Sequence, residues 1–222
     1  MSDIRTLSME TEGLDTLRQE LRYTERRLLA RPETVAFAAP FTAMGVRWPA
    51  IRDEQLALWD AEDDADVAVS NVDDDADDFV DVISRAMIHH LGGREHPHYK
   101  RLFGTRAPSE IQGLGLESQR AQMAEWPSAL RAMPAELVPY ADQAQAILDQ
   151  GRTVLDARAA ANAARANYRI NAIRGFFDEA NTLRLSTFAK LLELAATSGR
   201  PKTWPKRFFR SLKKAKPATS AA

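Results

Sequence analysis

Residues 71–82 read NVDDDADDFVDV and place six aspartates within twelve positions. Apolar residues recur through and beyond this run at intervals of three or four, at Val69, Val72, Ala76, Phe79, Ile83 and Met87. This spacing is that of one face of an α-helix, and the aspartates fall between the apolar positions. The stretch therefore predicts a long helix from Asp53 to Leu91, which ends at Gly92–Gly93 and exposes its aspartates to solvent.

Helical periodicity extends over most of the chain, and no segment has the alternation of a strand. A first helix should end near Arg31–Pro32, because proline restricts the residue before it. Its apolar face comprises Leu14, Leu17, Leu21 and Leu28, and its solvent-facing residues include Arg18, Arg22, Glu25 and Arg26. Residues 33–46 favour a shorter helix bent at Pro40, and residues 117–126 favour another.

The second half of the chain contains the longest helical pattern, from Ala135 to Thr197. Gly151 is its most natural break, which gives helices over 135–150 and 152–198, although one kinked rod is also consistent with the pattern. The later helix carries an apolar seam of Ile173, Phe176, Phe177, Ala180, Leu183, Thr187, Leu191 and Leu194. The least helical stretch, 92–117, is expected to be a connection packed through Tyr99, Leu102, Phe103, Ile111 and Leu114.

These long helices with few connections predict an all-α fold, an antiparallel helical bundle of the four-helix type with additional short helices. We expect one bundle domain over residues 1–199, followed by a basic, aromatic-containing tail over 200–222. The helices at 53–91 and 152–198 should form its longest antiparallel pair. The chain has no cysteine, its first residues lack the apolar core of an export signal, and its longest uncharged stretch is interrupted by Pro40. A cytoplasmic location is expected.

Charge is unevenly distributed along the chain. Residues 53–81 hold thirteen acidic side chains and no basic one, so the remainder carries a net +12 against a total of −1. Asp74 with Asp78 and Asp77 with Asp81 are like-charge pairs one turn apart, each unfavourable by about 0.2–0.5 kcal/mol. Packing of the apolar face, or a basic partner, must offset this repulsion.

Neither the aspartates nor the histidines have the spacing of a known metal site. A calcium loop beginning at Asp73 would need glycine at position 78, where aspartate stands, and glutamate at position 84, where serine stands. Only one glutamate precedes a histidine by three residues, Glu95 before His98, whereas di-iron bundles require such a pair on each of two helices. We expect no metal ion and no cofactor; the candidate ligands, if a metal binds, are His89, His90, His96 and His98.

The C-terminal segment GRPKTWPKRFFRSLKKAKPATSAA, residues 199–222, carries eight basic residues and no acidic one. Its aromatic residues suit docking on the protein's own body, and its cations suit a protein partner, an anionic membrane or nucleic acid. The candidate partner-binding residues are Trp204, Lys206, Arg207, Phe208, Phe209, Arg210, Lys213 and Lys214.

No motif for serine hydrolysis, phosphate binding or dinucleotide binding occurs, so no catalytic residue and no small-molecule substrate are assigned. We expect a non-catalytic intracellular interaction or scaffold protein that binds a protein partner or itself. The alternative is a peripheral membrane- or nucleic-acid-associated protein acting through the basic C-terminal segment, and a metal-dependent bundle enzyme is the third hypothesis.

Overall fold

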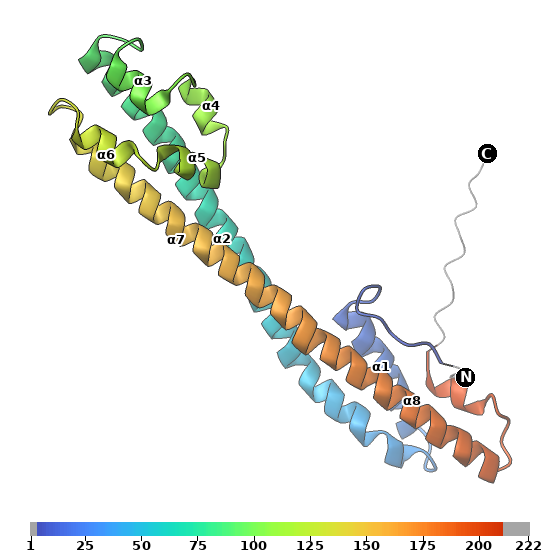
Figure 1. Ribbon diagram of the computed structural model, residues 1–222. Coiled ribbons are helices and arrows are strands. Elements are labelled where there is room, and N and C mark those ends of the chain that lie inside the picture. The colour runs from blue at the N-terminus through green and yellow to red at the C-terminus, as the bar shows by residue number, and fades with distance from the viewer. Residues whose placement is uncertain (1–3, 211–222) are drawn as a thin grey trace, which may run out of the picture. The chain divides into compact units, whose positions relative to one another are not determined.

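The computed structural model describes residues 4–210, and within this range every regular element is a helix (Figure 1). The all-α prediction is confirmed, and the finer four-helix arrangement stays a prediction. The three longest helices are α2 (Ala39–Leu91), α7 (Pro139–Tyr168) and α8 (Arg174–Thr197). None of the helices in the described range combines the length and the apolarity needed to cross a bilayer.

The chain forms two compact units, each with its own hydrophobic core. The expected division into one domain over residues 1–199 and a tail over 200–222 stays a prediction. Unit 1 comprises Met1–Ala57 and Ala166–Ala222, and unit 2 comprises Leu58–Arg165. Helices α2 and α7 contribute residues to both units. Unit 2 is therefore continuous in sequence, whereas unit 1 combines the two ends of the chain.

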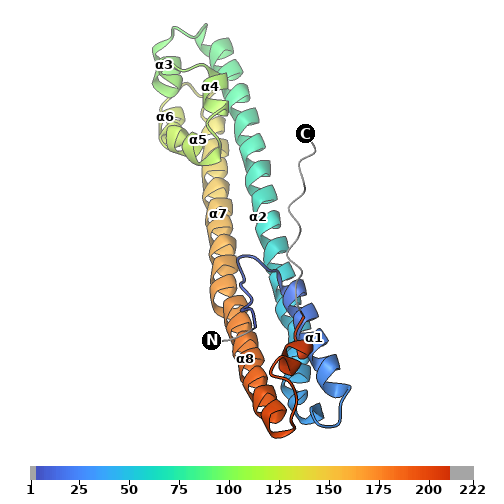
Figure 2. The ribbon, with the colours of Figure 1, turned by 90° about the vertical axis from the view of Figure 1, so that its right-hand side faces the viewer.

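In unit 2, α2 and α7 lie side by side and run in opposite directions (Figures 1 and 2). All six residues of the predicted apolar face, from Val69 to Met87, are buried in this core. The helices that complete the unit are α3 (Pro97–Phe103), α4 (Pro108–Gln112), α5 (Leu116–Met123) and α6 (Trp126–Arg131).

The segment predicted to be a connection, 92–117, contains the helices α3 and α4. Pro97 and Pro108 are the first residues of these helices. Proline is tolerated there because a backbone N–H at this position would have no carbonyl partner within the helix. Of the residues expected to pack this segment, Leu114 is half-buried and the others are buried. The packing prediction is therefore confirmed, and the expected lack of helix is wrong.

Helix α2 corrects two predictions about its N-terminal part. It begins at Ala39 and continues through Pro49 to Leu91, so it neither ends at Val46 nor begins at Asp53. Pro40 lies in the first turn, where it is tolerated, and does not bend the helix interior. Continuity past Pro49 is explained by packing, because Phe41, Met44 and Trp48 of this part of the helix are buried in the core of unit 1.

Helix α7 corrects the predicted break at Gly151. The helix begins at Pro139 rather than Ala135 and passes through Gly151 to Tyr168, where the π-helical turn η2 (Arg169–Ile173) separates it from α8. A Cβ atom at position 151 would overlap the side chain of Arg120, whose Nε donates to the carbonyl of Leu148 at 3.1 Å. The glycine thus admits a close neighbour and does not end the helix. The antiparallel partner of α2 in unit 2 is consequently α7, not a helix that begins at residue 152.

Unit 1 packs α1 (Leu14–Leu29), the short turn η1 (Val35–Phe37), the first part of α2, α8 and the short helix η3 (Trp204–Phe208). Most of the predicted seam of α8 is buried, and Leu183 and Leu194 are half-buried. Asn181 of α8 holds the N-terminal segment through two bonds to Leu7: its Oδ1 accepts from the Leu7 N–H at 2.9 Å, and its Nδ2 donates to the Leu7 carbonyl at 2.8 Å.

Candidate functional site: an arginine groove

The aromatic residues predicted to bind a partner are packed inside unit 1. Trp204, Phe208 and Phe209 are at most 5% exposed. The ring centroids of Trp204 and Phe208 lie 4.8 Å apart, and those of Phe209 and Phe188 lie 5.8 Å apart. These rings are therefore covered by the protein's own body, which is one of the alternatives that the sequence allowed.

The cationic residues of the same segment remain at the surface. Lys206, Arg207 and Arg210 are exposed, and Lys213 and Lys214 lie outside the described residues. Two hydrogen bonds join this segment to α1: Arg27 Nε donates to the Arg207 carbonyl, and Arg210 Nη1 donates to Gln19 Oε1, both at 3.1 Å. The cations of the C-terminal segment are thereby brought beside those of α1.

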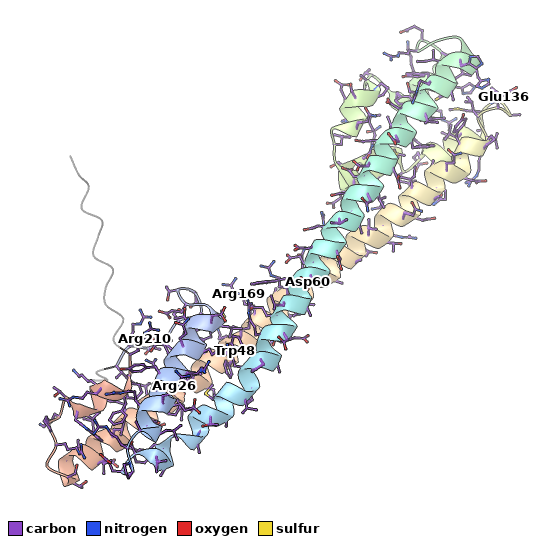
Figure 3. All side chains as sticks on the ribbon, turned by 180° about the vertical axis from the view of Figure 1, so that it is seen from behind. Arg26, Trp48, Asp60, Glu136, Arg169 and Arg210 are labelled. Carbon is purple, nitrogen blue, oxygen red and sulfur yellow. The ribbon has the colours of Figure 1, made fainter. Side chains whose placement is uncertain are left out.

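Together these elements form a groove with a volume of about 480 Å³. We call it the arginine groove; its lining consists of Gln19, Arg22, Tyr23, Arg26, Arg27 and Arg210. Figure 3 labels Arg26 on α1 and Arg210 in unit 1. The groove thus brings four guanidinium groups to one surface, and among residues 4–210 no carboxylate belongs to its lining.

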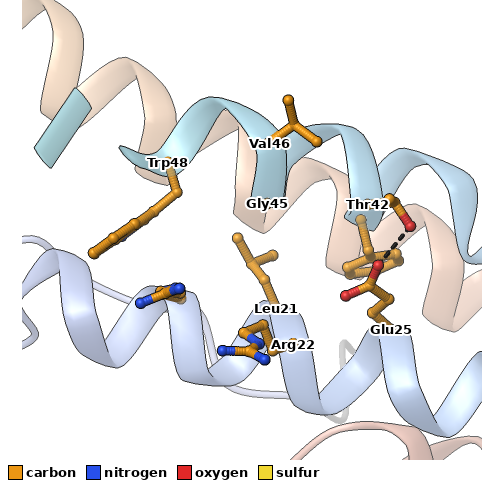
Figure 4. Close-up of a pocket in the computed structure, with 9 residues that line it drawn as sticks. Leu21, Arg22, Glu25, Thr42, Gly45, Val46 and Trp48 are labelled. Atoms are coloured by element: carbon orange, nitrogen blue, oxygen red, sulfur yellow. Dashed lines mark hydrogen bonds between the residues drawn. The ribbon is translucent and has the colours of Figure 1, made fainter. Parts of the chain in front are cut away.

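A smaller pocket of about 230 Å³ lies between α1 and α2 and shares Arg22 with the arginine groove (Figure 4). The guanidinium carbon of Arg18 lies 4.2 Å from the centroid of the Trp48 ring, and Trp48 Nε1 donates to the Leu14 carbonyl at 3.0 Å. The carboxylate of Glu25 accepts a 2.5 Å hydrogen bond from Thr42. Glu25, the acidic residue of α1 beside the arginine row, is therefore hydrogen-bonded to α2.

Two arginines of the groove have no ion-pair partner among the described residues. Within residues 4–210, the side chains of Arg22 and Arg26 form neither an ion pair nor a hydrogen bond. With Arg18 they stand at positions i, i+4 and i+8 of α1, so each neighbouring pair is unfavourable by about 0.2–0.5 kcal/mol. An anion bound across them would relieve this repulsion, and guanidinium groups bind carboxylates and phosphates through paired N–H donors.

A buried ion pair lies beneath α1. Glu20 and Arg184 are 1% and 2% exposed, and the nearest charged atoms, Oε2 and Nη2, are 3.9 Å apart. Burial raises the pKa of Glu20, and the charges of Arg184, Arg210 and Arg5 act in the opposite direction. Since Arg210 acts on a buried carboxylate as well as lining the groove, the C-terminal segment contributes to both the core and the surface of unit 1.

Unit 2 presents the opposite charge. The aspartates that lie opposite the buried face of α2 share an arc of about 120° on the helix. We call this surface the acidic face; it comprises the exposed residues Asp60, Asp63, Asp64, Asp74, Asp75, Asp78 and Asp81. None of them forms an ion pair in the described part of the chain. Among the acidic residues of 58–81, only Glu62 is paired there, with Arg165. The predicted solvent exposure of these aspartates is confirmed.

Two aspartates beside this face are partly buried. The carboxylate of Asp77 accepts a 2.8 Å hydrogen bond from Nε2 of the buried Gln119. The pKa of Asp73 is raised, first by burial and then by the negative charges of Asp77 and Asp74. The bond between Asp77 and Gln119 joins α2 to α5, and neither aspartate belongs to the acidic face.

The histidines do not assemble into a metal site in the described range, where no three histidine, aspartate or glutamate side chains gather around one point. His89 and His90 meet edge to face, with ring centroids 4.8 Å apart, and His96 and His98 stack at 5.2 Å. His96 caps α3, because its Nδ1 accepts from the His98 N–H at 3.2 Å. This bond uses a nitrogen lone pair that a metal would need.

Comparison with known proteins identifies no relative: neither a family model, nor a curated protein, nor a solved structure matches this chain. The groove is therefore interpreted from its own chemistry. The sequence analysis had assigned Arg22 and Arg26 to solvent and did not connect them with Arg210. A signal was present in the sequence, since arginines at i, i+4 and i+8 repel one another as the aspartates of α2 do.

Proposed function

We propose that this protein is a non-catalytic intracellular interaction protein, and that unit 1 binds an acidic protein partner through the arginine groove. The observation that carries the proposal is the exposed pair Arg22 and Arg26, which lines a groove of four arginines and forms no ion pair within the described residues. The chemistry of the lining supports binding rather than catalysis. Besides the arginines it offers the amide of Gln19 and the phenol of Tyr23, neither of which is accompanied by a general base.

The size of the groove favours a compact acidic surface over an extended polyanion. The row from Arg18 to Arg26 is about 12 Å long at the helical rise of 1.5 Å per residue. Unit 2 of the same chain has 19 acidic and 10 basic residues, a net charge of −9 with neutral histidines, which would repel a long nucleic acid or an anionic membrane.

Burial of the C-terminal aromatic residues also disfavours the alternative hypothesis. Insertion into a membrane interface requires an exposed apolar face, and stacking on single-stranded bases requires exposed rings. Trp204, Phe208 and Phe209 offer neither, because they pack in the core of unit 1. The exposed charge that remains suits carboxylates on a partner protein.

The proposal is tested by fluorescence anisotropy with a short labelled peptide of alternating aspartate and glutamate. Arg22→Ala/Arg26→Ala should weaken peptide binding by about tenfold or more, which corresponds to about 1.4 kcal/mol. The fold should survive, because both side chains are exposed and their loss relieves repulsion in α1.

Arg101→Ala/Arg106→Ala is the matched control, since it removes two exposed arginines from unit 2. If the control weakens peptide binding equally, the effect is explained by net charge alone and the proposal is contradicted. Duplex DNA and anionic vesicles are measured in parallel. Tighter binding of either one through Arg22 and Arg26 would replace the acidic protein partner with that alternative.

A further inference from the structure

We infer that the acidic partner of the arginine groove is the acidic face of α2 in a second copy of this chain. This inference rests on the proposed function and names the partner of the same groove. It follows from two exposed surfaces of opposite charge, one in each unit, that both remain without ion pairs in the described part of the chain.

The two surfaces match in spacing as well as in sign. Arg22 and Arg26 are separated by four residues on α1, and Asp74 and Asp78 are separated by four residues on α2. Both steps are therefore about 6 Å along a helix axis. Two helices laid side by side can pair these guanidinium and carboxylate groups one to one, whereas an irregular acidic loop has no such regular spacing.

Association would relieve repulsion in both helices at once. In α1, Arg22 lies one turn from Arg18 and from Arg26, and in α2, Asp74 lies one turn from Asp78. Each row is destabilised by its own like charges, and each supplies the counter-charge that the other lacks.

The same features predict a reversible, salt-sensitive association. Both surfaces are solvent-exposed, and the Debye length shortens from about 10 Å at 0.1 M salt to about 3 Å at 1 M. Every copy carries one groove and one acidic face, so association can close as a symmetric dimer with two equivalent contacts or continue head to tail. In either case the average mass in solution should rise at low salt and with protein concentration.

Sedimentation velocity of the full chain at low and high salt tests the inference, with charge reversal on each surface. Arg22→Glu/Arg26→Glu reverses the groove, and Asp74→Arg/Asp78→Arg reverses the acidic face. Each variant alone should sediment as a monomer at low salt. An equal mixture of the two should associate again, because the reversed groove now complements the reversed face.

The control for net charge is Glu136→Arg/Asp156→Arg, which makes the same charge change as Asp74→Arg/Asp78→Arg at exposed positions of unit 2 away from the acidic face. This control should associate like the unaltered chain at low salt, whereas the face-reversed variant of equal net charge should not. Circular dichroism of every variant verifies that the helices are retained. Loss of association in the control as well would show that net charge alone drives association, and would overturn the inference.

The remaining outcomes separate the inference from the proposed function. A chain that is monomeric at every salt concentration, yet binds the acidic peptide through Arg22 and Arg26, would overturn the inference and leave the proposed function standing with a different acidic partner. An unaltered chain that neither binds the acidic peptide nor self-associates would overturn both the inference and the proposed function. If both reversed variants still associate, the contact lies on another surface and the inference is overturned.

Discussion

Unit 1 and unit 2 are built from the same kind of helix but differ in connectivity and in charge. The core of unit 1 joins α1 and the start of α2 to α8 and η3, from the opposite end of the chain, whereas the core of unit 2 comes from one continuous segment. Over residues 4–57 and 166–210 unit 1 has 17 basic and 11 acidic residues, a net +6, against −9 for unit 2. The overall charge of −1 thus conceals two surfaces of opposite sign.

The difference teaches that positive charge in this molecule is gathered by long-range closure, whereas negative charge is gathered within one helix. The acidic face of unit 2 is a local property of one helix. The arginine groove of unit 1 arises only because residues 204–210 return to α1, where Arg210 binds Gln19. Substitutions that destabilise one unit and not the other, or that remove the C-terminal segment from unit 1, test this comparison directly.

The largest expected effect is that of a charge placed in either core. Phe177→Asp in unit 1 and Ile83→Asp in unit 2 replace side chains that are 2% and 0% exposed, and each should cost about 4–5 kcal/mol or more. Hydrogen exchange should show lost protection first in the unit that carries the substitution. Asp75→Asn, at an exposed position, is the control and should change little. Equal loss of protection throughout both units would show that they unfold as one.

Removal of the C-terminal segment should destabilise unit 1 selectively. A chain that ends at Ser198 loses the three buried aromatic residues Trp204, Phe208 and Phe209, and truncation of one such side chain typically costs about 3–5 kcal/mol. Thermal unfolding should therefore begin at lower temperature, with exchange protection lost around α1 and α8. An unchanged melting temperature would contradict the contribution of this segment to the core.

The buried pair Glu20–Arg184 should show strong coupling within unit 1. Arg184→Met leaves the Glu20 carboxylate buried without its counter-charge, and a loss of about 3–5 kcal/mol is expected. Glu20→Met should cost a similar amount, but the double substitution should cost much less than the sum. Urea unfolding of the four proteins measures the coupling, and additive losses would show that the two charges do not interact.

Gly151 in unit 2 provides a smaller and more specific test. Alanine is favoured over glycine in a helix interior by about 1 kcal/mol, but here its Cβ would overlap Arg120. Gly151→Ala should therefore fail to stabilise the protein unless Arg120→Ala is also present, in which case the gain of about 1 kcal/mol should appear. The same gain in both backgrounds, measured by urea unfolding, would refute the close contact.

The smallest expected effect is the pH dependence of Asp73→Asn in unit 2. Because the folded state raises the pKa of Asp73, this carboxylate favours folding when protonated, and its contribution is lost as pH rises through the raised pKa. The substitution should stabilise unit 2 at neutral pH, where it removes repulsion from Asp77 of about 0.2–0.5 kcal/mol. That gain should shrink as the pH falls toward the ordinary aspartate range. A gain independent of pH would contradict the assignment.

Local patterns were sufficient to predict much of the fold. The face from Val69 to Met87 could be predicted because periodicity depends on neighbours a few residues away. Gly151 was misinterpreted because its intrinsic preference is overridden by packing against Arg120. The helix predicted to begin at Asp53 begins earlier because Phe41, Met44 and Trp48 are buried. The arginine groove could not be predicted from local sequence patterns, because Arg210 and Gln19 are separated by 191 positions in the sequence.

The return of residues 204–210 to α1 also sets an order of events during synthesis. All residues of unit 2 have been added once Arg165 has been made, whereas the leucines of α1 can pack only on the first part of α2 until α8 and η3 follow. At about 5–20 residues per second, translation from the end of α1 to Trp204 takes roughly 10–35 s. During that interval the apolar face of α1 is incompletely covered and accessible to chaperones, whereas unit 2 can already be folded on the ribosome.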